Sequence, residues 1–408
     1  MRNTAEKIIK AAIKATDPYI NTVRILSQIT VEGRLTVLSV GKAAVPMAKA
    51  AEDVFRERIS KGLLVTKYHH SEGFSSGLFE VIESGHPISD DNSIKAAEKG
   101  LEAVASLGAN DTLVVLLSGG GSSLFEKSRV SPPLQRDITQ KLLSRGADIT
   151  EINAVRKKLS FVKGGLLADA AYPAKVITVA LSDVLGNEPS VIASGPTVFP
   201  CDSDEFILGV TDKYLYDIPE NVKNILTQKH EIQINNGGFY FAGDINLLCD
   251  AALKCAGEYG FTVHSMQRNI SGEASEEAQR ILDMIPAERG KHCYIFGGEC
   301  VVTLKGNGKG GRNQEAALKA AICLNGKKGI TFASAGSDGT DGPTSAAGGI
   351  VDGMSFSEMS SLGIDPVKEL ENNNSNYALG ISGGLLITGP TGTNVNDIIV
   401  VLTDNYEN

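Results

Sequence analysis

A repeated pattern of short apolar runs, each ending abruptly at Gly, Ser or Asp, constrains the fold of this chain more than any other feature. A segment with helical spacing of its apolar residues follows each run. This order is typical of βα units, in which parallel strands alternate with helices. In the first half we expect strands at 36–40, 62–66, 79–83, 112–117 and 175–181. The fold class is therefore α/β, with a mainly parallel sheet.

A second series of the same kind follows a break in this rhythm at 201–236, which ends in Ile-Asn-Asn-Gly-Gly. Its expected elements are strands at 239–242, 262–265 and 293–296, with helices at 246–259 and 273–284. The 408 residues also exceed the roughly 250–300 that one core usually supports. We predict two α/β domains, 1–228 and 229–408, whose ligands bind beyond the carboxyl ends of the strands.

Composition excludes several classes of protein. With 42% hydrophobic and 21% charged residues the chain is of globular type, and its net charge of −9 disfavours nonspecific nucleic-acid binding. No apolar run approaches the roughly 18 residues of a membrane span, and the first residues lack a signal peptide's apolar core. We expect a cytoplasmic protein whose partners are small molecules, and no binding to nucleic acid or to a membrane. Whether two copies form a homodimer is left undecided by the sequence. The six cysteines form no Cys-x-x-Cys pair, so free thiols are expected.

Two strand ends of the first half carry anion-binding features. Gly41 and Lys42 follow the first strand and precede a helix, so Lys42 would lie at a helix N-terminus, where an anion is favoured. The run Ser118, Gly119, Gly120, Gly121, Ser122 and Ser123 follows strand 112–117. Its amides and hydroxyls suit a phosphate or carboxylate. The alternatives are that Lys42 is an ordinary solvated surface lysine and that the run 118–123 is a flexible connection between a strand and a helix.

The segment 151–165 concentrates basic residues in an acidic chain. Arg156, Ser160 and Lys163 would share one helical stripe, beside an inward stripe of apolar residues. We assign Arg156 and Lys163, with Asn153, to substrate binding; a solvated basic face is the alternative. Asp183 ends strand 175–181, where it would hold Mg²⁺ or accept a substrate hydroxyl proton, unless it only caps the next helix.

The second half offers further candidates. Gly297, Gly298 and Glu299 follow a strand, and the loop 306–311 is rich in glycine and opens a helix. We expect Gly310, Gly311, Arg312 and Asn313 to bind phosphate there, with Arg312 contacting it through two hydrogen bonds. Asp338 and Asp341 form an acidic turn suited to a cation, and Asn394 precedes strand 398–402. The six histidines lack metal-ligand spacing, so structural roles are expected for them.

Taken in order, the segments GKAA, ESGHPISD, LLSGGGSSL, INAVRKKLSFVKGG, LSDVLGNEPSVIASGPT, GGRNQE, SAGSDGTDGPT and GPTGTNVND resemble the class II glycerate kinase family. The resemblance spans nearly the whole chain. It implies a larger Rossmann-like N-terminal domain, a smaller α/β MOFRL domain and an active site in the cleft between them. It also implies transfer of the ATP γ-phosphate to the 2-hydroxyl of D-glycerate with Mg²⁺ or another divalent cation.

The resemblance assigns catalytic roles to Lys42 and Arg312, and Asp183 is a further catalytic and metal-binding candidate by position. The family commonly has an acidic residue where this chain has Asn187, which moves the metal-binding role toward Asp183. Two other functions stay open. A nicotinamide-dependent hydroxypyruvate reductase would need a Gly-x-Gly-x-x-Gly turn after a strand and an acidic residue about 20 positions on, and we find no such turn. A noncatalytic nucleotide sensor would use the same loops.

Overall fold

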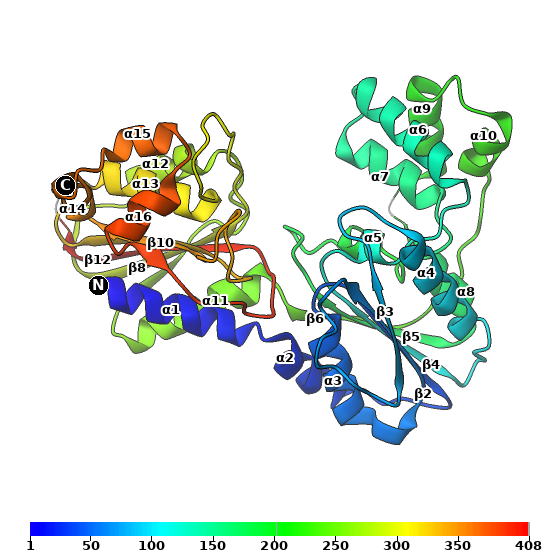
Figure 1. Cartoon of the computed structure of the whole chain (residues 1–408). Helices are drawn as coiled ribbons and strands as arrows, with labels where there is room; N and C mark the ends of the chain where they lie inside the picture. Colours follow the sequence, from blue (N-terminus) through cyan, green and yellow to red (C-terminus); the bar gives the residue numbers. More distant parts are fainter. Residues whose placement is uncertain (201, 407–408) are drawn as a thin grey trace. The chain divides into compact units, whose positions relative to one another are not determined.

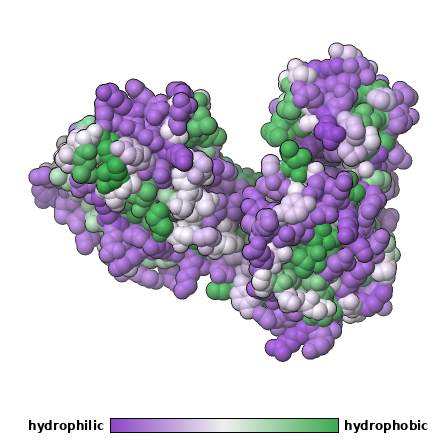
Figure 2. All heavy atoms as spheres, viewed as in Figure 1, coloured by the Kyte–Doolittle hydropathy of each residue, from purple (hydrophilic) through white to green (hydrophobic). Residues whose placement is uncertain are grey.

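The computed structural model describes residues 1–200 and 202–406, which form two compact units (Figure 1). We call Pro18–Leu181 with Asn187–Ala242 the parallel-sheet unit. Met1–Asp17, Ser182–Gly186 and the chain from Gly243 onward form the mixed-sheet unit. Figure 2 shows hydrophilic side chains over much of the visible face of each unit. No helix of the described residues is long and apolar enough to cross a membrane.

The sheet of the parallel-sheet unit has the order β3-β2-β1-β4-β5-β6. Its strands are β1 (Leu35–Val40), β2 (Ile59–Lys67), β3 (Phe79–Ser84), β4 (Thr112–Leu117), β5 (Lys175–Leu181) and β6 (Asn235–Gly243). Neighbours from β3 to β5 all pair in parallel. Every residue of β1 and β4 is buried, as expected for central parallel strands with helices on both faces. The five strands expected in the first half are thus confirmed.

Helices of this unit fall into two groups. Those around the sheet are α2 (Pro18–Leu26), α3 (Ala44–Phe55), α4 (Asp91–Val104), α5 (Gly121–Leu124) and α8 (Leu166–Ala171), with the 3₁₀ turns η1 (Arg56–Arg58) and η2 (Ile192–Ser194). The others are α6 (Pro132–Ser144), α7 (Ile149–Lys158), α9 (Asp204–Tyr214) and α10 (Glu220–Thr227). These four form a helical cluster with its own apolar core, which includes Leu142, Val155 and Val210 (Figure 1).

The mixed-sheet unit holds a second sheet of order β11-β10-β9-β12-β8-β7. Its strands are β7 (Thr262–Ser265), β8 (Glu288–Gly298), β9 (Ile330–Gly336), β10 (Gly348–Asp352), β11 (Leu385–Leu386) and β12 (Asp397–Tyr406). Only the β7–β8 pair is parallel in this sheet, as far as the described residues show. We expected a second series of βα units here, and such units have parallel strands. That expectation is wrong for most of this sheet, because its strands pair mainly antiparallel. A fully buried strand such as β9 looks the same in either direction, because direction is set by the connections.

Helices cover both faces of this second sheet (Figure 1). On one face α1 (Arg2–Ala15) packs against α11 (Ile245–Glu258). On the other, α12 (Ala274–Met284) packs against α13 (Arg312–Cys323), and α14 (Ser355–Ser361), α15 (Pro366–Glu371) and α16 (Ser375–Ile381) lie around α13. A core that includes Phe296, Phe332 and Val401 fills the space between this face and its helices.

The division between the units differs from the expected boundary at residues 228 and 229 in two places. The N-terminal helix α1 belongs to the mixed-sheet unit, where it buries Ile8, Ile9 and Ala12 against α11 and the sheet. Strand β6 completes the first sheet instead of opening the second. An amphipathic pattern specifies which face of a helix is buried but not the partner that buries it. The five described cysteines are free, as predicted; Cys201 lies outside the described residues.

Candidate active site

The carboxyl ends of β1 and β4 meet at a close backbone contact between Gly41 and Ser118. A Cβ on Gly41 would lie 2.2 Å from the Ser118 Oγ, and Gly41 has a φ of +129°, so only glycine fits this turn. The Lys42 N–H donates to the Gly119 carbonyl at 2.9 Å, and the Ala43 N–H donates to Ser118 Oγ at 3.0 Å. The fold thus brings together Lys42 and the serine- and glycine-rich loop Ser118–Ser123, two features that the sequence suggested separately.

Positive charge gathers beside this loop. Burial lowers the pKa of His70 and of His86, and the charges of Lys42 and Lys67 lower both further. A Cβ on Gly120 would lie 2.9 Å from the His86 ring, so this imidazole faces the loop. The Lys42 side chain is half-buried and has no carboxylate partner among the described residues. Neither histidine was predicted as a site residue, although His86 lies in the ESGHPISD segment.

A strained segment supports the other side of the loop. Ala193, Ser194 and Gly195 have φ values of +49°, +63° and +60°, which is unfavourable for the first two. Ser194 Oγ lies 2.8 Å from Ser122 Oγ, and a Cβ on Gly121 would lie 2.8 Å from the Ala193 Cβ. Backbone strain of this kind persists where the surroundings over-determine it, often at functional sites. The position of the loop is therefore fixed from both sides.

The basic segment 151–165 differs from the expected single helix. Helix α7 ends at Lys158, so Ser160 and Lys163 do not continue its stripe. Lys163 is almost fully buried and forms an ion pair with Glu126, which also accepts a hydrogen bond from Ser160 at 2.9 Å. Its charge is therefore balanced inside the unit, and it does not join Arg156 on a common face. Asn153 and Arg156 lie half-buried on α7, and burial lowers the pKa of Arg156.

A cavity of about 340 Å³ lies beside this segment, and its lining includes residues of α7 and α9 and of the stretch 228–232. Lys157 and Lys158 line it, but Lys157 pairs with Asp202 at 2.9 Å and Lys158 with Asp204 at 2.8 Å. Internal carboxylates therefore balance these cations.

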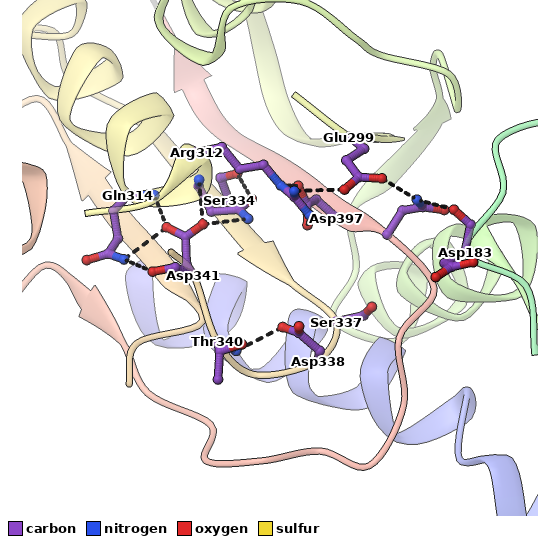
Figure 3. Close-up of polar contacts among 12 residues, drawn as sticks. Asp183, Glu299, Arg312, Gln314, Ser334, Ser337, Asp338, Thr340, Asp341 and Asp397 are labelled. Atoms are coloured by element: carbon purple, nitrogen blue, oxygen red, sulfur yellow. Dashed lines mark hydrogen bonds and ion pairs between the residues drawn. The ribbon is translucent and has the colours of Figure 1, made fainter. Parts of the chain in front are cut away.

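In the mixed-sheet unit, the Arg312 side chain is held by two carboxylates (Figure 3). Its Nε and Nη2 donate to Asp397 at 2.5 Å and 3.0 Å, and its Nη1 donates to Glu299 at 2.8 Å. Asp397 is buried, which raises its pKa to about 6 even though Arg312 acts in the opposite direction. These contacts fix the orientation of the guanidinium, a third of whose side-chain surface stays exposed.

Asn396 links this ion pair to Asp183. Its Nδ2 donates to the Asp183 carbonyl at 2.8 Å and to Glu299 Oε2 at 3.2 Å, while its backbone has a φ of +69° (Figure 3). Arg312, Asp183 and Glu299, all predicted site residues, are thus brought together. Sequence reasoning missed Asn396 and Asp397. Their signal was the polar run GPTGTNVND directly before a buried strand, because such strand ends commonly carry functional groups.

The N-terminus of α13 already holds a carboxylate of the protein. Asp341 accepts hydrogen bonds from the backbone N–H groups of Asn313 at 3.1 Å and Gln314 at 2.8 Å. The side chains of these two residues donate to the same carboxylate at 3.3 Å and 2.9 Å. With four donors on its two oxygens, Asp341 caps the helix, which leaves few lone pairs for the cation expected at this turn.

Most of the described amides in the glycine-rich loop 306–311 have internal partners as well. The N–H groups of Lys305 and Gly306 donate to the Asn373 side chain, at 2.7 Å and 3.0 Å. Those of Asn307 and Lys309 donate to the side chains of Asn372 and Asn374, each at 3.1 Å. The amides of Gly306, Asn307 and Lys309 are therefore already paired, while the phosphate contacts expected at Gly310 and Gly311 stay a prediction.

Tight packing explains why glycine occupies the other predicted glycine positions of this unit. A Cβ on any of these four glycines would lie within 2.7 Å of another atom. The atoms lie in Ile245 for Gly297, Ile270 for Gly298, Ser375 for Gly310 and Asp341 for Gly311. Asp338 accepts the Thr340 N–H at 2.9 Å, and Asn394 lies half-buried before β12. Arg312 combines partial exposure with an orientation that Asp397 and Glu299 fix.

Comparisons with known proteins place this geometry in a family. Residues 4–227 match the domain of unknown function DUF4147, and residues 292–397 match the MOFRL family. The chain is 45% identical to the D-glycerate 2-kinase of Thermotoga maritima over 98% of each chain. It is 37% identical to a glycerate 2-kinase of Pyrococcus horikoshii, over 98% of this chain and 97% of that one.

Solved structures agree with these sequence matches. The crystal structure of glycerate kinase from Thermotoga maritima superposes with a TM-score of 0.94 at 45% identity, covering 98% of this chain and 99% of that one. A protein from Pyrococcus horikoshii superposes with a TM-score of 0.86 at 36% identity, covering 99% and 98%. The chain therefore belongs to the family of glycerate kinases whose C-terminal part is the MOFRL domain.

Proposed function

We propose that this protein is a D-glycerate 2-kinase, which transfers the γ-phosphate of ATP to the 2-hydroxyl of D-glycerate and releases ADP and 2-phosphoglycerate. The observation that carries the proposal is the full-length similarity to D-glycerate 2-kinases, in fold and in sequence. The oriented cations described above support it, because phosphoryl transfer depends mainly on positioning and on neutralising charge.

Lys42 and Arg312 have the chemistry to neutralise phosphate oxygens in this reaction. Lys42 has no internal carboxylate partner among the described residues, so its charge is available to a ligand. Arg312 is held by Asp397 and Glu299, so its exposed guanidinium meets a ligand in a fixed orientation. Preorganised charges of this kind lower a barrier because they need no rearrangement during the reaction. The loop Ser118–Ser123 adds hydroxyl and amide donors beside Lys42.

A divalent cation such as Mg²⁺ is part of the proposal. Hard cations prefer oxygen ligands, and the Asp183 backbone carbonyl and the Glu299 carboxylate both accept from Asn396, with no thiol or imidazole among these groups (Figure 3). When bound, the ion would neutralise charge on the ATP phosphates. Asp183 would hold the ion or orient the attacking hydroxyl. Asn396 fixes the Asp183 backbone by its hydrogen bond at 2.8 Å.

The alternative of a hydroxypyruvate reductase has one argument from the comparisons. A relative from Agrobacterium vitis, 38% identical over 98% of this chain and 94% of its own length, is named a putative hydroxypyruvate reductase. Gly306, Gly308 and Gly311 also have the Gly-x-Gly-x-x-Gly spacing, which the sequence analysis passed over. However, this loop does not follow β8 directly, and the amides of Gly306, Asn307 and Lys309 pair with the side chains of Asn372–Asn374. A dinucleotide pyrophosphate needs such amides to be free.

One set of assays separates the three functions. A kinase releases ADP only when glycerate, ATP and Mg²⁺ are all present, a reductase oxidises NADH with hydroxypyruvate, and a sensor does neither. We expect the first result. ³¹P NMR of the product beside authentic standards then identifies the phosphorylated position, for which we expect 2-phosphoglycerate. A product that is mainly 3-phosphoglycerate would contradict the regiochemistry, and ADP release without glycerate would contradict the acceptor.

A further inference from the structure

Two histidines and a glutamate converge at the edge of the second sheet, on β7 and β8. The Nε2 of His264 lies 3.2 Å from the Nδ1 of His292, and this Nδ1 lies 3.4 Å from Oε1 of Glu288. Strand pairing explains the convergence. Thr262 pairs with His292 and His264 with Tyr294, while Glu288 and His292 lie four residues apart on one strand face. Ligand atoms from all three side chains lie within 4.8 Å of one another.

These separations match those around a tetrahedral metal ion. Zinc binds nitrogen and carboxylate oxygen at about 2.0–2.1 Å, and two such ligands at a tetrahedral angle lie about 3.4 Å apart. The three side chains therefore need little movement to share one ion. We propose that His264, Glu288 and His292 bind one Zn²⁺ or another late first-row divalent cation, for which imidazole is a preferred ligand.

Neighbouring groups hold each ligand in the orientation that the site needs. His292 Nε2 lies 2.9 Å from the Arg289 carbonyl, so this nitrogen carries the proton and Nδ1 presents its lone pair. Such a hydrogen bond to the second ring nitrogen accompanies most metal-bound histidines. The His264 ring stacks on Tyr294 with 4.5 Å between ring centres and 10° between planes. The Tyr294 hydroxyl donates to Glu288 and fixes that carboxylate.

The site is accessible from solvent and lies at the other end of β8 from Gly298, which pairs with Asp397, the partner of Arg312. The side chains of His292 and Glu288 keep 14% and 32% of their surface exposed, so an ion can enter and water can complete its coordination. His292 and Gly298 lie six residues apart on β8, which is about 20 Å at roughly 3.3 Å per residue. The ion would join edge strand β7 to β8, and its role would be structural.

Zn²⁺ titration against a chromophoric chelator tests this site. The full-length protein should bind one ion per chain, and Co²⁺ should give the visible absorption bands of a tetrahedral site. His264→Phe keeps the stacking on Tyr294 but removes a ligand, so it should weaken Zn²⁺ binding at least tenfold, on the scale of lost metal contacts. Glu288→Gln should also weaken binding while it keeps an acceptor for Tyr294.

The matched control is His230→Gln, because His230 also contacts a carboxylate, Asp169 at 2.7 Å, but has no second histidine beside it. This variant should bind Zn²⁺ as the unmodified protein does. Zn²⁺ should raise the melting temperature of the unmodified protein and of the control, but not of His264→Phe. Mg²⁺-dependent kinase activity should be the same in all of them. Failure of the unmodified protein to bind one Zn²⁺ at micromolar concentration, or equal binding by His264→Phe, would overturn the proposal.

Discussion

Arg312 and Asp397 contact each other through two parallel hydrogen bonds, from Nε to Oδ2 at 2.5 Å and from Nη2 to Oδ1 at 3.0 Å. Asp397 opens β12 and Arg312 opens α13, so two elements far apart in sequence fix one guanidinium. Pairing of this kind sets direction as well as charge. It predicts that both the planar shape of Arg312 and the ionisation of Asp397 matter for turnover.

Arg312→Lys should lower kcat/KM for glycerate by about 10²–10³-fold, the scale of losing one preorganised donor. A lysine keeps the charge but cannot contact Asp397 at two points and a phosphate as well. The matched control is Arg268→Lys, because Arg268 forms a surface ion pair with Asp250 and should tolerate the change. Steady-state kinetics measure both variants. Full activity of Arg312→Lys would show that charge alone is needed at this position.

The pH profile of kcat/KM should fall on the acid side with an apparent pKa near 6. Burial raises the pKa of Asp397 to about 6, so the carboxylate is ionised at pH 7 and gains a proton as the pH falls through 6. Once neutral, it no longer orients Arg312, so activity is lost toward acid pH. Asp397→Asn should be about 10²-fold less active at pH 7 and should lack this acid limb. An unchanged limb in the variant would assign it to another group.

Lys42→Ala should reduce kcat by about two to four orders of magnitude, because a preorganised cation would no longer face the transferred phosphate. The fold should persist, since Lys42 has no carboxylate partner among the described residues. Lys49→Ala is the control, because Lys49 is an exposed lysine on the helix that follows Lys42. Circular dichroism checks folding and the ADP-release assay checks rate. Near-normal turnover would remove Lys42 from the site.

Asp341→Ala should lower the free energy of unfolding by about 1–3 kcal/mol, as expected when a helix cap and its buried hydrogen bonds are lost. The substitution leaves the N–H groups of Asn313 and Gln314 without their acceptor. Asp338→Ala, in the same turn, removes a single contact to Thr340 and should cost less than about 1 kcal/mol. Urea unfolding measures both. Equal effects would contradict the capping role.

Local sequence patterns determined the strands of the parallel-sheet unit and the glycine-rich turns at their carboxyl ends. The runs at 112–117 and 175–181 have the same bounds in the structure, since buried parallel strands are continuous apolar segments that end sharply. Gly41 after the run at 36–40 and the glycines after the run at 112–117 marked a turn and the loop Ser118–Ser123 for the same local reason.

Tertiary structure alone decided which patterned segments meet and which polar groups stay free. The antiparallel order of the second sheet, the packing of α1 on that sheet and the pairing of Asp397 with Arg312 all join residues distant in sequence. The same holds for Asp341, which looked like a cation ligand but caps α13, and for Lys163, which pairs with Glu126. Sequence shows that a charged side chain is present. Only the fold shows whether a ligand or another residue of the protein neutralises it.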